Sequence, residues 1–555
     1  MKRLTFVLSC LLLTTIVVFA GQWHKVAEGV APISAQVMES DINRTVIHYQ
    51  ISGYSADQIE IEGVEYTLLQ KLRKESMIEE KDYPRLPRVN RSIVIPDNGG
   101  MNYQVIASDY IEISDIDIAP SKGHLLRSVN PDEVPYTFGE VYQKDAFYPE
   151  HLVNLREPYI LRDYRGMVVE LNAFQYNPVT RTLRIYTDVT IEVKKDASFG
   201  LNELNRSEPL TAIHPQFLKI YQRHFLNFDL TDYPILLEDG SMLIICYDNF
   251  LSILEPLVDW KNQRGLPTTM VPLSQVGSST GAIQNYIRNT YLSSDLVYVL
   301  LIGDAAQVPT FGGLDSDPVY TLIQGNDSYP EIFIGRFSAE TQQQAYTQVQ
   351  RTIDYEMSPQ PGADWYHRGL GIASNQGPGH HGEYDDEHIT LIAYKLLNYT
   401  YTIVDSVYDN WGTQSMITNR LNQGRSIINY CGHGSTTSWG TTGFNNGDVN
   451  DLVNSNMLPH IVSVACVNGS FVSSTCFAEA WLRATHDVTG EPTGAVGAYM
   501  SKRSQSWSPP MDMQDEGVDL MVADSMRTFG GICFNGSMLM IDLNGSSGEG
   551  EFKSW

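Results

Sequence analysis

The sequence predicts two architectures in succession, a β-rich domain and then an α/β domain whose sheet is mostly parallel. Apolar and polar residues largely alternate in stretches such as 182–193, which is typical of half-buried strands. After residue 239, short apolar strands alternate with helical stretches. The strands are expected at 242–246, 296–302, 427–430, 460–465 and 495–499, and the helices at 251–264, 339–357 and 385–397. This alternation indicates a mostly parallel sheet flanked by helices, a fold in which chemistry collects at the carboxyl ends of the strands.

The first residues have the features of a secretory signal. Lys2 and Arg3 precede an apolar run at 4–18, and the small residue Ala20 follows. Because this run is shorter than the roughly twenty apolar residues of a membrane anchor, residues 1–20 are predicted to be a signal peptide. No later segment is long and apolar enough to span a bilayer, so the product is expected to be secreted or held at the cell surface.

The 555 residues are more than a single core holds, and the rest of the chain divides into four parts. Residues 21–200 are the β-rich domain. In residues 201–239 periodicity weakens and Asn and Pro accumulate, which predicts an exposed linker with a processing region. Residues 240–365 and 366–555 are expected to be two similar subdomains of the α/β domain. The end of the chain, 551–555, is typical of the start of another element, so the protein is expected to be truncated there.

Charge excludes one class of partner. The chain carries 65 acidic and 38 basic residues, for a formal net charge of -27. Sequence-independent binding to nucleic acid or anionic lipid requires a basic surface. Such partners are therefore not expected. An acidic exterior suits a protein that meets calcium or cationic substrates, or it simply keeps a secreted protein soluble.

Cysteine usage excludes another class. Without Cys10, which lies in the signal, five cysteines remain, so at least one is unpaired within the chain and a disulfide scaffold is not expected. Neither CxxC spacing nor an HExxH motif is present, so a zinc centre has no support. No redox or organic cofactor is expected.

Two predicted strands end in loops that carry reactive side chains. His433 stands between Gly432 and Gly434 just beyond the strand at 427–430, and Cys466 follows the strand at 461–465. A thiolate is the attacking species in cysteine catalysis, and a nearby imidazole takes its proton and later returns it to the leaving amine. The order His then Cys, at neighbouring strand ends of an α/β sheet, is that of the caspase-like peptidases. Cys431 and Cys476 are the competing nucleophiles, and both are interpreted as packing residues.

Several separated blocks of the chain resemble the gingipain family of cysteine peptidases. The blocks are 259–266 (DWKNQRGL), 429–435 (NYCGHGS), 464–469 (VACVNG), 476–480 (CFAEA) and 505–507 (QSW). The similarity runs from about Leu243 to the end, and the β-rich part, including 175–184, resembles the family's propeptide. The resemblance implies a caspase-like catalytic domain of two subdomains behind a β-rich propeptide domain.

The resemblance also implies the roles of the catalytic residues. Cys466 matches the nucleophile and His433 the general acid and base, with the amides of Gly434 and Cys466 as the oxyanion hole. One position departs from the family, since Gln376 stands where a carboxylate near the histidine is expected. An amide can orient the imidazole but cannot offset its positive charge, so a weaker ion pair is expected, or Asp385 or Asp386 substitutes.

A specificity pocket follows from the same resemblance. Asp385, Val464, Trp507 and Met511 match positions that surround an arginine side chain in the arginine-selective members. A buried carboxylate under an aromatic wall suits a guanidinium, which binds carboxylates in a bidentate manner and stacks on indole. Alternatively Asp385 caps the helix that begins there, and lysine remains open as a second specificity.

The resemblance further implies a structural calcium site. The matching residues are Asp304, Asp327, Tyr329, Glu331, Glu383 and His388. Calcium takes six to eight oxygen ligands, which carboxylates and carbonyls from separate loops supply. The alternative is that these are solvated loop residues.

Together these features predict a secreted zymogen that cleaves peptide bonds after basic residues, arginine preferred. Its partners are protein or peptide substrates and its own propeptide as inhibitor. Arg223 is a candidate cut site, and Arg73, Arg85 and Arg88 are candidates to occupy the pocket as an inhibitory mimic. Two alternatives remain, a surface peptide-binding protein without activity and a sorting transpeptidase that resolves the same thioester with an amine.

Overall fold

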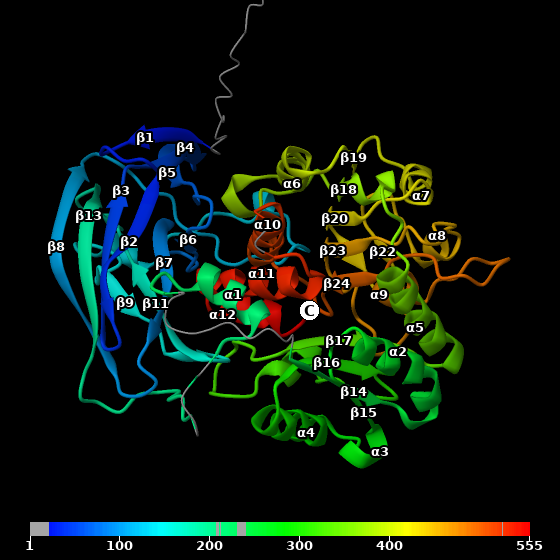
Figure 1. Ribbon diagram of the computed structural model, residues 1–555. Coiled ribbons are helices and arrows are strands. Elements are labelled where there is room, and N and C mark those ends of the chain that lie inside the picture. Colours follow the sequence, from blue (N-terminus) through cyan, green and yellow to red (C-terminus); the bar gives the residue numbers. More distant parts are fainter. Residues whose placement is uncertain (1–20, 207–209, 211, 230–239, 524–525) are drawn as a thin grey trace, which may run out of the picture.

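The computed structural model describes residues 21–206, 210, 212–229, 240–523 and 526–555. The predicted signal peptide, 1–20, and part of the predicted linker therefore lie outside the described residues. Figure 1 shows a β-rich N-terminal domain, coloured blue to cyan, beside an α/β domain coloured green to red. The predicted fold class is confirmed.

The N-terminal domain is built of antiparallel sheets around one hydrophobic core. Its strands are β1 (Gln22–Lys25), β2 (Ile33–Asp41), β3 (Arg44–Ile51), β4 (Gly53–Ile61), β5 (Val64–Leu69), β6 (Ser76–Ile78), β7 (Leu86–Ile95), β8 (Met101–Ile113), β9 (Val153–Leu155), β10 (Tyr159–Leu161), β11 (Tyr164–Leu171), β12 (Phe174–Asn177) and β13 (Thr182–Lys195). One sheet has the order β12-β13-β3-β2 with β8 also on β13, the second has the order β10-β11-β7-β6 with β9 on β11, and a third is β1-β4-β5. Leu183, Ile185, Val189, Ile191 and Val193 of β13 are all fully buried, so alternation at period two places one face of this strand in the core.

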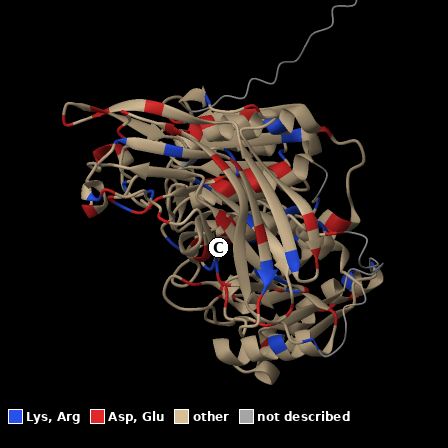
Figure 2. Ribbon diagram, turned by 90° about the vertical axis from the view of Figure 1, so that its left-hand side faces the viewer, with Lys and Arg blue, Asp and Glu red and all other residues tan. Residues whose placement is uncertain are grey.

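The outer face of this domain carries both signs of charge. Figure 2 looks onto that face, and the positions of acidic residues (red) and basic residues (blue) are interspersed along the ribbon of its strands and loops. Arg184 of β13 pairs with Glu112 of the neighbouring strand β8 at 2.7 Å. Such cross-strand pairs of opposite charge favour the observed register over slipped alternatives.

The first half of the α/β domain is a four-stranded parallel sheet. Its order is β15-β14-β16-β17. The strands are β14 (Ser241–Cys246), β15 (Thr268–Pro272), β16 (Leu296–Ile302) and β17 (Phe333–Phe337), and the helices are α2 (Leu251–Gln263), α3 (Leu273–Val276), α4 (Thr280–Ser293) and α5 (Gln342–Met357). Strands such as β16 are apolar along their whole length because helices cover both faces of the sheet.

The second half is a five-stranded parallel sheet with the order β19-β18-β20-β23-β24. Its strands are β18 (Arg368–Ala373), β19 (Ile403–Tyr408), β20 (Ile427–Cys431), β23 (His460–Val464) and β24 (Gly497–Met500), with a small hairpin of β21 (Gly434–Ser435) and β22 (Ser438–Trp439). Its helices are α6 (Asp385–Tyr399), α7 (Gln414–Asn422), α8 (Asn446–Asn450), α9 (Phe477–Arg483), α10 (Pro509–Val522), α11 (Phe529–Asn544) and α12 (Ser546–Phe552).

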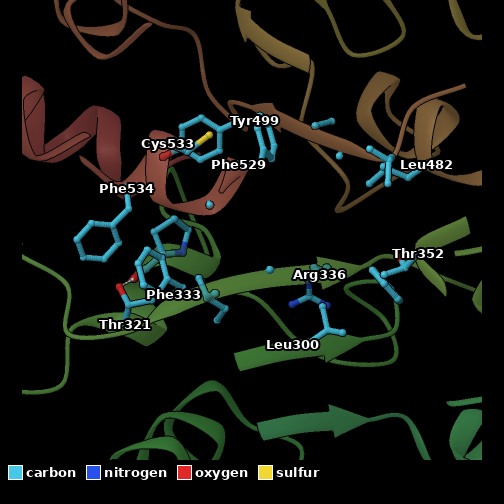
Figure 3. A pocket seen from close by; sticks show the side chains of 18 of the residues that line it. Leu300, Thr321, Phe333, Arg336, Thr352, Leu482, Tyr499, Phe529, Cys533 and Phe534 are labelled. Carbon is cyan, nitrogen blue, oxygen red and sulfur yellow. Dashed lines mark hydrogen bonds between the residues drawn. The ribbon is translucent and has the colours of Figure 1, made fainter. Parts of the chain in front are cut away.

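An apolar cavity of about 300 Å³ lies where the two parallel sheets approach each other. Figure 3 shows Phe333 on one side and Tyr499, Phe529, Cys533 and Phe534 on the other. None of the candidate site residues lines this cavity. It is therefore separate from the site described below.

The predicted linker is in part an ordered helix. Helix α1 (Pro215–His224) lies within 201–239, and its side chains Phe217, Ile220 and Tyr221 are fully buried. Their spacing of three and four residues forms one apolar face, which packs on α11 through Phe217 and Phe534. The prediction of an exposed linker is therefore wrong for residues 215–224.

Among the described residues, no helix has the length and apolar character required to cross a membrane.

Candidate active site

The histidine and cysteine loops leave adjacent strands at the same edge of the sheet. Strands β20 and β23 are parallel neighbours in which Cys431 is paired with Val464. His433 and Cys466 each lie two residues beyond these partners, so the two loops begin side by side. The amide of Gly432 also donates to the carbonyl of Val464 at 3.1 Å. The predicted pairing of His433 with Cys466 thus follows from strand register.

Gly434 is required by the close contact between these loops. A Cβ at this position would lie 2.6 Å from the carbonyl oxygen of Cys466 and 2.9 Å from the Cβ of Ala465. Any larger side chain would push the histidine loop away from the cysteine. Glycine therefore brings the two backbones, and the two amides expected to form the oxyanion hole, together.

Hydrogen bonds fix both loops. The Asn468 amide donates to the carbonyls of Ser435 at 2.7 Å and Ser438 at 3.0 Å. The carbonyl of His433 accepts from the Tyr430 hydroxyl at 2.6 Å. Neither loop depends on the catalytic side chains for its conformation.

The imidazole of His433 contacts the amide of Gln376. Its Nε2 lies 2.5 Å from the Gln376 Oε1. Because that oxygen accepts, the proton resides on Nε2, and Nδ1 is the nitrogen that can take another. Burial lowers the pKa of His433, and the Arg127 guanidinium lowers it further. Since Gln376 is neutral, it supplies no charge to offset an imidazolium.

The thiol of Cys466 is enclosed in this state of the protein. It is 7% exposed, and its Sγ accepts from the Gln505 amide at 3.4 Å. Burial raises its pKa, while the Gln505 amide and the Arg127 guanidinium act in the opposite direction. The next residue, Val467, has a φ of 52°, a strained conformation for a β-branched residue. The nucleophile is thus held protonated beside a tight backbone turn.

Arg127 of the N-terminal domain fills a pocket next to this thiol. Its Nη1 donates to both oxygens of Asp385 at 3.0 Å, and both side chains have no exposed surface. Its Cζ lies 4.7 Å from the centre of the Trp507 ring. The Ser374 hydroxyl donates to Asp385 at 2.6 Å. Asp385 is thus the partner of a buried arginine side chain, and the N-cap of α6 is Tyr384 instead.

Two further predicted pocket residues, Val464 and Met511, are both fully buried and belong to one hydrophobic cluster. Val464 is the strand partner of Cys431. The side chains of Met511 and Trp507 both lie against Gly379.

Cys431 belongs to this pocket, although the sequence indicated only packing. Its Sγ accepts from the Arg127 Nη2 at 3.1 Å and donates to Asp385 at 3.1 Å. Burial raises its pKa well above the ordinary value, so it remains a neutral thiol. Cys476, by contrast, is the buried N-cap residue of α9.

The segment around Arg127 pairs with residues 505–507 through backbone hydrogen bonds. Leu126 forms an isolated antiparallel bridge with Ser506, and the Arg127 amide donates to the Gln505 carbonyl at 2.8 Å. The Trp507 amide and indole donate to the carbonyls of Leu125 at 3.1 Å and Val129 at 3.0 Å.

The three arginines proposed for the pocket lie elsewhere. Arg73 pairs with Asp515, Arg85 donates to the Leu69 carbonyl, and Arg88 lies 3.4 Å from Glu170. Arg127 lies in an irregular segment between β8 and β9, where no hydrophobic periodicity distinguishes it. The preceding apolar residues Leu125 and Leu126 are the one local feature that indicates a buried segment.

The six expected calcium ligands do not form one site. Asp304 lies 3.5 Å from Arg483, the Tyr329 hydroxyl donates to Asp542, and Glu383 lies 3.3 Å from His388. Among the described residues, no group of three or more His, Cys, Asp or Glu is arranged to hold a metal. The expected ligand set therefore does not fit the geometry.

Two of the six, Asp327 and Glu331, are buried carboxyl groups with raised pKa values. Burial raises the pKa of Asp327 to about 7, and burial together with Asp327 raises that of Glu331 well above its usual value. The Oε1 of Glu331 is buried without a hydrogen-bond partner among the described residues.

Both halves of the chain match known families. The profile of the family described as Peptidase family C25 matches residues 235–553, and that of Propeptide_C25 matches residues 36–231. Gingipain R2 of Porphyromonas gingivalis is 41% identical over 493 residues, which cover 86% of this chain and 66% of that protein. Gingipain R1 of the same organism is 40% identical over 86% of this chain and 49% of its own length. The chain thus spans at most 66% of these relatives.

Solved structures agree with this. The arginine-specific cysteine proteinase gingipain R matches with a TM-score of 0.56 and 40% identity, over 57% of this chain and 76% of that one. The complex of Porphyromonas gingivalis RgpB pro- and mature domains matches with a TM-score of 0.55 and 40% identity, over 57% of this chain and 77% of that one.

Proposed function

Because the chain belongs to peptidase family C25, we propose that it is the precursor of a cysteine endopeptidase that cleaves after arginine and is held inactive by its own N-terminal domain. The observation that carries this proposal is the arginine pocket, in which Arg127 is bound by Asp385, Cys431 and Trp507 beside the thiol of Cys466. The comparisons support the family, and the residue roles below are part of the proposal.

Activation replaces Arg127 by the arginine of a substrate. The substrate guanidinium then contacts Asp385, and its backbone pairs with residues 505–507 as the segment around Arg127 does now. This pairing brings the carbonyl carbon of that arginine to Cys466. Positioning of this kind turns a bimolecular attack into an effectively unimolecular one.

The chemistry follows from the groups at the strand ends. The Cys466 thiol gives its proton to His433, and the thiolate attacks the carbonyl carbon. The amides of Gly434 and Cys466 stabilise the oxyanion of the tetrahedral intermediate. His433 returns the proton to the leaving amine, and a thioester forms. Water, losing a proton to His433, then releases the carboxylate product and restores the thiol.

Gln376 is a positioning residue in this scheme. Its amide oxygen orients the imidazole through Nε2. Gln376 adds no negative charge. The stability of the His433 imidazolium therefore depends on the electrostatic effect of the neighbouring charged side chains. The sorting transpeptidase would share every step up to the thioester, and no contact in the structure favours it.

The N-terminal domain acts as the inhibitor by occupying the pocket and pairing with residues 505–507. Export is a separate part of the proposal, because the predicted signal lies outside the described residues.

For calcium, the proposal is limited to the Asp327 and Glu331 pair. A divalent cation there would neutralise two buried carboxylates. Lowering of the melting temperature by EGTA, absent in Glu331→Gln, supports this, whereas equal melting temperatures with and without EGTA remove it.

The test of the main proposal is amidase activity of the activated protein on matched peptides with arginine, lysine or a neutral residue before the cleaved bond. Cleavage after arginine that Cys466→Ala abolishes supports the nucleophile and the pocket. Activity that persists in Cys466→Ala, or equal cleavage of all three peptides, rejects them. Product analysis with an added amine separates hydrolysis from ligation.

A further inference from the structure

Helix α10 carries a stripe of acidic side chains next to the arginine pocket. The stripe consists of Asp512, Asp515, Glu516 and Asp519. Their spacing of three and four residues places them on one face of the helix. Ser508, the residue after the pocket residue Trp507, lies four positions before Asp512 and continues the same face. The stripe therefore begins at the pocket wall.

In the precursor, basic side chains of the N-terminal region cover this stripe. The contacts are Lys71 with Asp512 (2.7 Å), Arg73 with Asp515, Lys74 with Glu516 (3.0 Å) and Asp519 (2.9 Å), and Arg223 with Glu516 (2.5 Å). The Lys71 ammonium also donates to Ser508 at 3.3 Å. Lys71 and Asp512 are each 2% exposed. A basic segment with the spacing Lys-x-Arg-Lys is thus already bound along the stripe.

Removal of the N-terminal region takes basic partners away from the stripe. Among the described residues, Glu516 loses both Lys74 and Arg223, whereas Asp519 loses Lys74 and keeps Lys395 of α6 at 2.6 Å. The stripe therefore becomes more negative beside the pocket and attracts cationic partners.

We propose that the acidic stripe of α10 becomes a docking surface for polybasic segments of protein substrates once the N-terminal domain has left. The inference rests on the proposed peptidase function and adds a second recognition element to it. The arginine pocket binds the residue before the cleaved bond, whereas the stripe binds a Lys- and Arg-rich segment elsewhere in the substrate. Proteins with such a segment are therefore preferred over equally cleavable ones without it.

The experiment uses enzyme activated from the full chain and three substrates that share one cleavable arginine sequence. The first substrate consists of the cleavable sequence alone. The second carries, after a flexible spacer, the basic segment Lys-Gly-Arg-Lys, and the third carries the neutral segment Gln-Gly-Gln-Gln after the same spacer. Peptides with the extension on either side of the cleaved bond cover both directions. At low salt we expect the basic extension to lower KM about tenfold relative to the neutral one, with kcat unchanged. At 0.5 M salt the difference should shrink, because exposed charges are screened.

The variant Glu516→Gln combined with Asp519→Asn is the structural test. It should remove the preference for the basic extension while KM for the short substrate stays unchanged. If this variant does not fold, the salt dependence of the wild-type preference remains as an independent test. Equal KM values for the two extended substrates overturn the docking surface while leaving the peptidase intact. Failure to cleave even the short arginine substrate rejects the proposed function instead.

Discussion

Arg127 and Asp385 form an ion pair from which solvent is excluded, with the Nη1 of one 3.0 Å from both oxygens of the other and no exposed surface on either side chain. The two residues are 258 positions apart and belong to different domains. Removing one partner would leave an uncompensated buried charge, which costs far more than loss of a surface pair. The contact therefore contributes to latency and to the stability of the precursor.

The substitution Arg127→Ala should weaken both properties. We expect the free energy of unfolding of the precursor to fall by ~3–5 kcal/mol, since Asp385 loses its counter-charge. The uncleaved precursor should also gain activity on arginine peptides. Denaturant unfolding and amidase assays measure the two effects. Arg85→Ala is the matched control, because Arg85 lies in the same domain but bonds to the Leu69 carbonyl. Similar behaviour of the two variants contradicts the assignment.

Cys431 should contribute to arginine recognition. In Cys431→Ala a substrate guanidinium loses the sulfur that now contacts Arg127, and hydrogen bonds to charged groups contribute about 1.5–3 kcal/mol. We expect KM for arginine peptides to rise by roughly tenfold, with little change in kcat, and Cys431→Ser to retain most of the affinity. Steady-state kinetics on activated enzyme measure this. Cys476→Ala, at the buried cap of α9, should leave KM unchanged, and a KM unaltered in Cys431→Ala would count against the pocket role.

A carboxylate at position 376 should alter the pH dependence of catalysis. Burial lowers the pKa of His433, and Gln376→Glu would place a negative charge against its Nε2 and raise it again. A raised pKa keeps His433 protonated, and so unable to accept the proton of Cys466, to higher pH, and the acid limb of kcat/KM should move up by about one pH unit. Profiles of the two enzymes between pH 5 and 10 test this. Superimposable profiles would show that position 376 has no electrostatic role.

The precursor should lose stability as the pH falls below neutrality. His460, whose ring packs against Tyr355 and Phe529, has its pKa lowered by burial to about 4. In the unfolded chain a histidine has an ordinary pKa of about 6.5. As the pH falls from about 6.5 to 4, the unfolded state therefore binds a proton at this residue while the folded state does not, and unfolding becomes more favourable. The loss from this residue is at most about 3.4 kcal/mol, from roughly 2.5 pH units at about 1.36 kcal/mol each. Urea unfolding of wild type and His460→Gln at several pH values checks it. An equally steep loss in the variant would implicate other groups.

Strand periodicity predicted most of the architecture, and the strand-end residues predicted two loops that lie side by side in the structure. His433 and Cys466 could be paired from sequence because parallel neighbours end at one edge, and Cys431 opposite Val464 sets that register. The pocket residues Asp385 and Trp507 came from motif resemblance and meet around one guanidinium.

The remaining features depend on long-range contacts that no local pattern reports. Arg127 lies in an irregular segment, and its partners are more than 250 residues away. The sequence does not distinguish the pocket contact of Cys431 from a packing role, because a thiol in the core and a thiol in a pocket have the same local sequence pattern. Helix α1 was overlooked because its short apolar face is flanked by polar loop residues. The expected calcium ligands do not meet because each has another partner: Asp304 pairs with Arg483, the Tyr329 hydroxyl donates to Asp542, and Asp327 accepts from backbone amides.

The burial of α1 separates cutting of the chain from loss of inhibition. A break between α1 and β14 leaves Phe217 packed on α11 and Arg127 in its pocket, so the two pieces stay together after the peptide bond is gone. Cleavage turns inhibition from an intramolecular contact into binding between two separate molecules. The N-terminal piece is then present at its concentration in solution and no longer at the effective concentration that the linker imposed. Activity of the cut protein should then depend on dilution, and the concentration of the surroundings would set when latency ends.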